Sequence, residues 1–428
     1  MRVRRVTFEG FRGLGKLELE LPPRTTVLVG KNGTGKSAIL NGVAVLLSRL
    51  PDYLQREVGG RRATSSRAIG SEDITNWQDR CALSIEVESG GETYTWARKA
   101  ERTLRGRAKE SEEGAGARPL VQKWLPSEAA KLEGASIPLA VIYPTNRAVL
   151  DVPLRIKTRH VFDQLDAWSL HSGESQFRLF FEWFRNREDI ENQDRLRLKR
   201  THRDRELEAV RKAISLLVPG LENLRVERTP LRMMVTKGKR DIEVDQLSDG
   251  EKCLLAMVAD LARRLSLANP RSADPLRGEG VVLIDEIELH LHPAWQRTVV
   301  ADLSRTFPSC QFLISTHSPQ VLGEVQPGDI YLLERGPTGV EANRPSASFG
   351  RDSNRLLEDL MGVPDRREET KSELAQLYKL IDQRRLSEAR DLRSKLATEI
   401  GETEPEFAKA DVLIRRQELK SETDHKGT

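Results

Sequence analysis

The sequence predicts an α/β fold in which helices flank a mixed β-sheet, a helical lobe is inserted into the chain, and a helical tail follows. Residues 17–30 have a strand pattern that leads into a glycine-rich turn and then into a segment with helical spacing, 37–50. Two short apolar runs bounded by turn residues, 278–288 and 310–318, have the form of parallel strands buried on both faces. Residues 162–217 are helical in pattern and rich in charge, which predicts the lobe.

Composition is typical of a globular protein. The 428 residues are 38% hydrophobic and 31% charged, enough for one large domain and a smaller appendage. We expect a cytoplasmic protein, since the sequence has neither a run of about 18 apolar residues nor a signal peptide. Cys81, Cys253 and Cys310 lie far apart and are expected to be reduced structural thiols. A net charge of +4 does not by itself indicate nucleic-acid binding.

These patterns divide the chain into five segments. We expect the first part of the main domain at 1–160, the helical lobe at 161–240, the second part of the main domain at 241–335, a connector at 336–365 and the tail at 366–428. Residues 81–98 are expected to form a hairpin that turns at 89–91, and the polar stretch that follows, to about 118, a loop. A buried strand should end at Pro144.

The most specific chemical motif is GKNGTGKS at residues 30–37, a complete GxxxxGK[ST] sequence between a strand and a helix. Its glycines let backbone N–H groups turn inward around phosphate oxygens, and the helix adds the positive end of its dipole. Lys36 is expected to bridge the terminal phosphates of a nucleotide, and the Ser37 hydroxyl to hold Mg²⁺. The predicted nucleotide-binding residues of this loop are Gly30, Asn32, Gly33, Thr34, Gly35, Lys36 and Ser37.

A second motif is VVLIDEIELHLHP at 281–293. A carboxylate at the end of a buried strand needs a cation, so Asp285 is a predicted Mg²⁺ ligand. Glu286 is expected to point differently and to accept a proton from the attacking water. His290 and His292 are expected in a loop at the nucleotide; metal binding is the alternative, although no third and fourth ligand is evident nearby.

His317 follows the apolar strand that begins at Cys310. Ligands of open α/β sheets bind at the carboxyl ends of parallel strands, so His317 is predicted to contact the γ-phosphate. A purely structural histidine is the alternative.

Together these residues resemble the ATPase head of the ATP-binding-cassette (ABC) superfamily, and within it the branch of RecF, the SMC proteins and the OLD-type ATPases. The resemblance covers residues 1–335. It rests on four motifs in the family's order, which are the Walker A sequence at 30–37, LSDGEK at 247–252, the Walker B strand VVLIDE at 281–286 and STHSP at 315–319. It implies the ABC-type P-loop fold, ATP and Mg²⁺ as cofactors, and ATP hydrolysis.

The resemblance also implies a homodimer or a higher oligomer. In the family, the signature LSGGE opens a helix that contacts ATP bound to the opposite subunit, so Ser248 and Gly250 should complete the site of a second chain. Asp249 replaces a signature glycine, and its carboxylate would repel a phosphate. Asn146 is the expected substitute for the family's Q-loop glutamine, and Arg12 the expected contact to the base or ribose.

Other segments of the chain differ from those of the SMC proteins and the OLD-type nucleases. About a hundred residues separate Asn146 from Leu247, too few for the coiled coils of SMC proteins, and the clustered acids of an OLD-type nuclease domain are missing. We therefore expect no nuclease domain in this chain. Two RxxxxH pairs, Arg155 with His160 and Arg197 with His202, imitate the active site of a class of RNases, an alternative that a basic chain produces by chance.

Residues 372–401 have the apolar spacing of an αα-hairpin, and a third helix is expected after Pro405. This tail either packs on the main domain or forms a docking platform. ATPases of this size with such a tail are similar to the ATPase subunit of Septu-type bacterial antiphage systems, which acts with a separate HNH endonuclease. The other function that we considered is a RecF-like, ATP-dependent DNA clamp in repair, with the basic cluster at 98–109 as its DNA contact.

Overall fold

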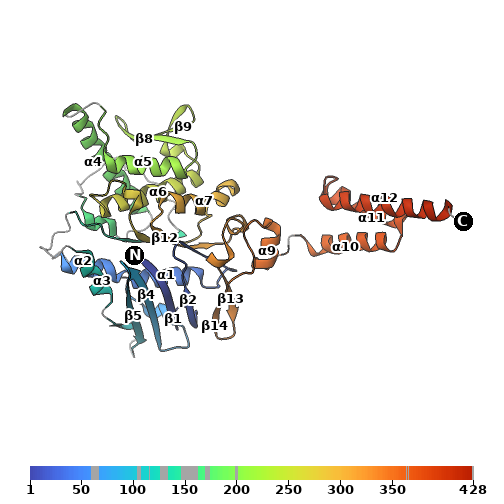
Figure 1. Cartoon of the computed structure of the whole chain (residues 1–428), viewed down its shortest axis with the longest axis horizontal. Coiled ribbons are helices and arrows are strands. Elements are labelled where there is room, and N and C mark those ends of the chain that lie inside the picture. Colours follow the sequence, from blue (N-terminus) through green and yellow to red (C-terminus); the bar gives the residue numbers. More distant parts are fainter. Residues whose placement is uncertain are drawn as a thin grey trace. The chain divides into compact units, whose positions relative to one another are not determined.

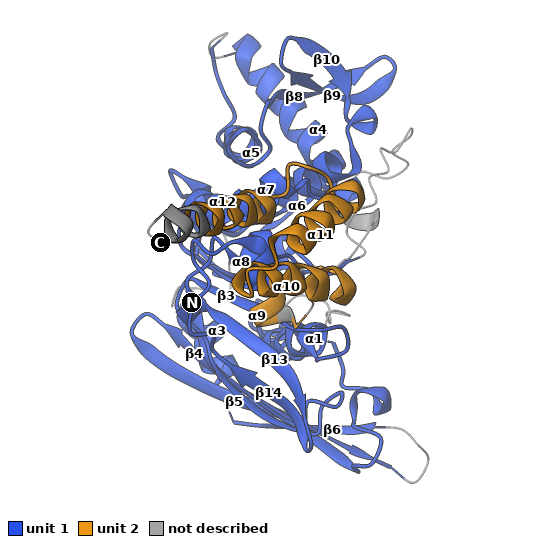
Figure 2. Ribbon diagram, turned by 90° about the vertical axis from the view of Figure 1, so that its right-hand side faces the viewer, with its two compact units in different colours: residues 1–356 blue, residues 357–428 orange. Residues whose placement is uncertain are grey.

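The computed structural model describes residues 1–58, 67–103, 108–114, 116–125, 134–145, 162–168, 174–197, 201–362, 364 and 366–426. The chain divides into two compact units, residues 1–356 and 357–428 (Figure 2), and each is described by itself. Within the described residues, no helix is both long and apolar enough to cross a membrane.

The main sheet of unit 1 has six strands in the order β14-β13-β3-β12-β11-β7. Its strands are β3 (Thr25–Val29), β7 (Leu139–Tyr143), β11 (Gly280–Ile284), β12 (Cys310–Thr316), β13 (Ile330–Gly336) and β14 (Gly339–Asn343). Only the pairing of β13 with β14 is antiparallel, so the other five strands end at the same edge. Every residue of β3, β11 and β12 is buried, as their apolar runs predict.

A second, antiparallel sheet has the order β2-β1-β4-β5-β6. Its strands are β1 (Arg2–Glu9), β2 (Lys16–Glu20), β4 (Arg80–Ser89), β5 (Glu92–Arg102) and β6 (Ala108–Glu113). The predicted hairpin is confirmed, because Ser89 pairs with Glu92. The prediction of a loop from the end of this hairpin, at residue 98, to about 118 is wrong in part. Strand β5 continues to Arg102, and β6 pairs with it.

Helix α1 (Lys36–Leu47) lies between the two sheets, with contacts to β12 and β7 on one side and to β4 on the other. A Cβ atom added at Gly42 would lie 2.4 Å from the ring of Phe8, so the small residue permits this close approach. Packing on both sides therefore holds α1 in place. Two further helices, α2 (Arg49–Glu57) and α3 (Ala117–Trp124), contact each other.

The predicted helical lobe contains helices and a small sheet. Helices α4 (Glu174–Arg197) and α5 (Arg205–Leu217) are followed by the antiparallel strands β8 (Leu221–Arg228), β9 (Leu231–Lys237) and β10 (Arg240–Glu243) (Figure 1). The expectation of a helical segment over the whole of 161–240 therefore missed three strands. Helix α6 (Asp249–Ala268) packs against α5 and contacts β7 of the main sheet.

Buried charges connect α6 to the main sheet. The Tyr143 hydroxyl, at the end of β7, donates a hydrogen bond of 3.0 Å to Asp260 of α6. Asp260 also pairs with Arg263 at 2.7 Å and with Arg264 at 2.6 Å, and all four side chains are almost fully buried. Because buried charges need partners, this network fixes α6 relative to β7.

The last helices of unit 1 are α7 (Pro293–Thr306) and α8 (Pro319–Leu322), and α9 (Ser353–Met361) spans the boundary between the units. The expected connector, 336–365, includes strand β14 of the main sheet and the whole of α9, so it is only partly a connector.

Unit 2 contains α10 (Glu368–Asp382), α11 (Leu386–Ile400) and α12 (Pro405–Lys426), as the tail pattern predicted. The three helices share an apolar core whose buried residues include Leu377, Leu396 and Phe407. The Tyr378 hydroxyl of α10 also donates a hydrogen bond of 2.6 Å to Glu406 of α12. This unit therefore has a hydrophobic core of its own.

Candidate nucleotide-binding and hydrolysis site

The glycine-rich loop begins where β3 ends and finishes at the first residue of α1. Gly30 has a φ of 156°, and a Cβ atom there would lie 2.4 Å from the carbonyl oxygen of Leu333. Gly35, which precedes α1, is left-handed with a φ of 94°. Only glycine fits these two positions without strain, so the local conformation explains the motif.

Lys36 is directed back into this loop. Its ammonium group donates hydrogen bonds to the carbonyl oxygens of Gly30 at 2.8 Å and Lys31 at 3.0 Å, and the residue is only 6% exposed. Burial lowers the pKa of Lys36, while the charges of Asp285, Glu286 and Glu288 act in the opposite direction. The structure thus brings the Walker A lysine close to the acids of the Walker B segment.

Ser315, on β12, orders the two predicted acids at the end of β11. The Glu286 backbone N–H donates to Ser315 Oγ at 2.8 Å, and that hydroxyl donates to Asp285 Oδ1 at 2.5 Å. Asp285 is 8% exposed, whereas Glu286 is partly exposed with a left-handed φ of 47°. The acids therefore have different environments, which suits different roles.

The donor set fits Mg²⁺ bound together with a nucleotide. Among the described residues, no group of three or more His, Cys, Asp or Glu could hold a metal ion by itself. Asp285 and Ser37 offer a carboxylate and a hydroxyl, the hard oxygens that Mg²⁺ prefers, and Mg²⁺ commonly takes its other ligands from substrate phosphates and water. Ser37 is exposed at the start of α1 and is accessible to such a ligand.

His317 lies just beyond the end of β12, on the same edge of the sheet, and is partly buried. Burial and the nearby Lys36 charge lower the pKa of His317, and this outweighs the opposite effect of Glu288, Glu286 and Asp285. A lowered pKa favours the neutral imidazole, which can donate a hydrogen bond to a phosphate through one nitrogen.

Two functional candidates were missed by sequence reasoning. Glu288 accepts hydrogen bonds from the His317 backbone N–H at 2.5 Å and from the Thr316 hydroxyl at 2.8 Å. Arg335, on β13, donates from Nε and Nη2 to the Gly33 carbonyl oxygen, each at 3.2 Å. The third acid of DEIE could have drawn attention to Glu288, whereas no sequence signal connects Arg335 to the loop.

The predicted signature residues open α6. Ser248 caps the helix, and its hydroxyl donates to Glu251 at 2.8 Å, while Glu251 pairs with Lys237 at 2.7 Å. The side chain of Asp249 is 81% exposed. A Cβ atom at Gly250 would lie 2.3 Å from the carbonyl oxygen of His290, so Gly250 also has a packing role within the chain.

Arg12 lies in the turn between β1 and β2, next to the glycine-rich loop. Its guanidinium pairs with Asp73 at 2.6 Å. In the same turn, Leu14 lies close to Gly35. A Cβ atom added at Gly35 would lie 2.5 Å from a methyl group of Leu14. The contact of Arg12 with a base or ribose stays a prediction, and Asn146 lies outside the described residues.

The two histidines after the Walker B acids differ in their surroundings. His292 caps α7, because its Nδ1 accepts the Ala294 N–H at 3.2 Å. His290 is exposed and left-handed, with a φ of 61°. Of the RNase-like pairs, Arg155 and His160 lie outside the described residues.

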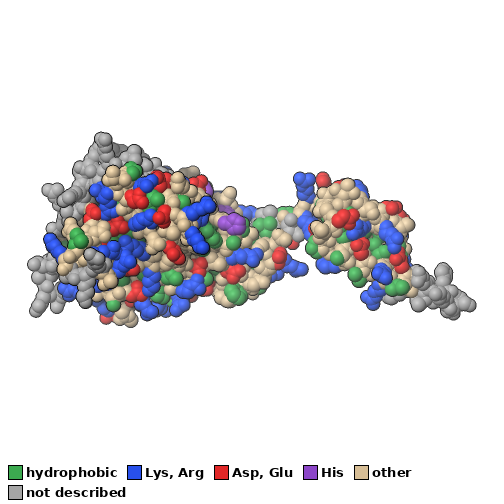
Figure 3. Space-filling model, turned by 90° about the horizontal axis from the view of Figure 1, so that it is seen from above, with side chains coloured by type: hydrophobic (Ala, Val, Ile, Leu, Met, Phe, Trp, Pro, Cys, Tyr) green, Lys and Arg blue, Asp and Glu red, His purple; other side chains and the backbone are tan. Residues whose placement is uncertain are grey.

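In the described part of the basic cluster at 98–109, Lys109 is exposed, whereas Arg98 is buried. Arg98 is 2% exposed and pairs with Glu110, and Lys99 pairs with Glu113 at 2.6 Å. Two other members, Arg105 and Arg107, lie outside the described residues. On the face of the molecule seen in Figure 3, acidic and basic side chains are interspersed. The prediction of a DNA contact is therefore wrong for Arg98.

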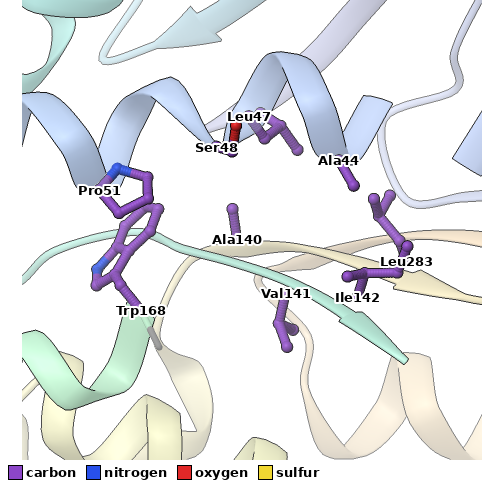
Figure 4. A pocket seen from close by; sticks show the side chains of 9 residues that line it. All are labelled: Ala44, Leu47, Ser48, Pro51, Ala140, Val141, Ile142, Trp168 and Leu283. Atoms are coloured by element: carbon purple, nitrogen blue, oxygen red, sulfur yellow. The ribbon is translucent and has the colours of Figure 1, made fainter. Parts of the chain in front are cut away.

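A small apolar pocket lies elsewhere on α1. Its lining includes Ala44 and Leu47 of α1, Ala140 of β7 and Trp168 (Figure 4). No charged side chain lines it, so it has no means of neutralising phosphates and is distinct from the candidate site.

The fold and the site define a P-loop ATPase, with the glycine-rich loop and the Walker B acids at the end of a largely parallel sheet. In agreement, a family model described as "AAA domain" matches residues 5–222, and one described as "AAA domain, putative AbiEii toxin, Type IV TA system" matches residues 142–323.

Three relatives extend this result. The "Retron Ec83 probable ATPase" of Escherichia coli is 30% identical over 89% of this chain and 80% of its own length. The "Retron Vc95 probable ATPase" of Vibrio cholerae serotype O1 biovar El Tor is 29% identical over 83% and 78%, respectively. "Septu protein PtuA" of Bacillus mycoides (strain KBAB4) is 27% identical over 43% of this chain and 25% of its own length. The chain belongs to the ATPase family that includes the retron Ec83 protein.

Proposed function

We propose that this ATPase is a regulatory subunit that dimerises through composite ATP sites and controls a separate nuclease of the HNH type in bacterial antiphage defence. The observation that carries the ATPase part is the convergence of Lys36, the Walker B acids and His317 at one edge of the main sheet. The relatives named for retrons and for a Septu system support the defence part.

In this proposal the chain binds ATP through the backbone N–H groups of the glycine-rich loop and through Lys36. Ser37 and Asp285 hold Mg²⁺, which neutralises charge on the phosphates. Glu286, the less buried acid, orients the attacking water and accepts its proton. His317, neutral near pH 7, donates a hydrogen bond to the γ-phosphate.

Dimerisation is proposed from the signature residues. Ser248 and Asp249 are exposed at the start of α6, where the helix dipole favours an anion. A second chain that offers its ATP to this helix end would complete one site, and twofold symmetry would complete another. ATP then acts as a ligand that stabilises the dimer.

For the nuclease contact we propose unit 2. Its own core leaves Val412 and Leu419 of α12 exposed, at 68% and 57%. These apolar side chains are candidates for a helical docking surface.

We expect the gene of an HNH protein to lie beside the gene of this chain, and the test co-expresses the two full-length proteins. We expect the two proteins to purify together, and Val412→Asp with Leu419→Asp to weaken the complex. Leu196→Asp is the matched control, because Leu196 is 88% exposed in unit 1. Purification of the unmodified chain without the HNH protein would contradict the proposed partner.

A further inference from the structure

We infer that Glu288 is a positioning residue, which holds His317 in the orientation that ATP hydrolysis requires. The inference rests on the proposed role of His317 at the γ-phosphate. Glu288 follows the Walker B strand, whereas His317 follows β12, so the carboxylate joins the ends of two neighbouring strands.

The contacts of Glu288 are bidentate. One carboxylate oxygen accepts the His317 backbone N–H at 2.5 Å, and the other accepts the Thr316 hydroxyl at 2.8 Å. The Thr316 hydroxyl oxygen in turn accepts the Ser318 N–H at 3.0 Å. Hydrogen bonds to a charged acceptor are stronger than neutral ones, so this one side chain determines the path of the backbone through His317.

Gln296 of α7 holds the same turn from its other side. Its side-chain oxygen accepts the Ser318 hydroxyl at 2.6 Å, and its side-chain nitrogen donates to the Leu291 carbonyl oxygen at 2.8 Å. Residues 316–318 are thus hydrogen-bonded at three consecutive positions, the first two to Glu288 and the third to Gln296 of α7. A side chain on so restrained a turn is preorganised for contact with a phosphate.

Glu288 itself is an unsuitable phosphate ligand, because its charge would repel the phosphate. Its influence on the reaction should therefore pass through His317. This distinguishes Glu288 from Glu286, which we propose to act on the attacking water itself.

The test is a double-mutant cycle with Glu288→Gln, His317→Ala and the combination of both. Glutamine keeps the shape but removes the charge and one acceptor, so we expect kcat to fall by about ten- to a hundredfold, as displacement of a reacting group does. If Glu288 acts through His317, the combined variant should hydrolyse ATP no more slowly than His317→Ala alone. Losses that multiply would overturn the inference.

Two further variants separate positioning from folding. Thr316→Val removes one bond to Glu288 without changing its charge, and should lower kcat less than Glu288→Gln does while the KM for ATP stays the same. Glu324→Gln, a change of the same kind at an exposed position, should leave kcat unchanged. If Thr316→Val hydrolyses ATP at the unmodified rate, the bidentate contact has no role in positioning. Normal turnover by His317→Ala would instead refute the proposed role of His317.

Discussion

The edge of the main sheet and the start of α6 carry the two halves of the proposed ATP site, and they are built differently. At the sheet edge, Lys36 is 6% exposed and Asp285 8%, and Ser315 hydrogen-bonds to the acid's carboxylate. At α6, the side chain of Asp249 is 81% exposed. Contacts within the chain hold the residues at the sheet edge in place. The start of α6, by contrast, exposes polar groups that a second chain can contact. Nucleotide binding and dimer assembly should therefore be separable by mutation.

The largest expected effect is on chemistry at the sheet edge. Glu286→Gln can still hydrogen-bond the water but cannot take its proton, so turnover should fall by about 10²- to 10⁴-fold while ATP still binds. A phosphate-release assay beside isothermal titration with ATP and Mg²⁺ measures both. The trapped nucleotide should also strengthen the dimer. Unchanged turnover would show that another group acts as the base.

Lys36→Ala changes the same part of the proposed site, the edge of the main sheet, and should weaken the binding of ATP. A hydrogen bond to a charged group contributes about 1.5 to 3 kcal/mol, so the affinity for ATP should fall by about ten- to a hundredfold or more. Isothermal titration decides this, with Lys31→Ala as a control, because Lys31 is exposed in the same loop. An affinity equal to that of the unmodified protein would refute the role of Lys36.

Mixing two inactive variants tests whether the halves belong to different chains. Ser248→Arg blocks the signature, and Lys36→Ala blocks the glycine-rich loop. In a heterodimer of the two, one site is intact and the other has neither part, so about half of the hydrolysis per dimer should return if the sites act independently. Phosphate release and light scattering measure turnover and association.

Two outcomes of the mixing experiment would contradict the proposed site. A mixture that neither associates nor hydrolyses more than its components removes the main support for a composite site. If Ser248→Arg alone hydrolyses ATP normally, the signature has no catalytic role in this chain.

The smallest expected effect is at Asp249. Replacing it by glycine or asparagine removes an exposed charge beside the proposed phosphate contact, so ATP-dependent association should strengthen by about two- to fivefold, the scale of exposed charge interactions. Light scattering at low and high salt checks this, because screening should reduce the difference between the variants and the unmodified protein. Weaker association of both variants would assign Asp249 a favourable role.

Sequence was most informative where a function depends on neighbours in the chain. The residues from Gly30 to Ser37 and the pair of Asp285 with Glu286 were predicted as local patterns, and the structure brings these segments together. Glu288 contacts a residue 29 positions away, and Arg335 one 302 positions away, so spacing could not reveal them. The strands β8, β9 and β10 were missed because they follow a long helical segment and contain many charged residues.

The prediction that Arg98 is exposed was wrong, because this side chain is buried. Arg98 lies in a polar stretch and was expected on the surface, but it lies on the same buried face of β5 as Trp96. Its guanidinium donates to the carbonyl oxygen of Val45 at 2.7 Å, at the end of α1. An arginine can be buried when backbone carbonyls and an acid receive its N–H groups, and sequence alone does not show these partners.

The close approach of Gly250 to the carbonyl oxygen of His290 places the start of α6 against the segment that follows the Walker B acids. His290 lies between Glu288, which holds the His317 turn, and Leu291, which is bonded to Gln296. A displacement of the start of α6 would therefore push on the segment that positions His317 in the same chain. In a symmetric dimer, each subunit could then sense through its own α6 whether its partner holds ATP, and the two sites would fire in a coordinated order.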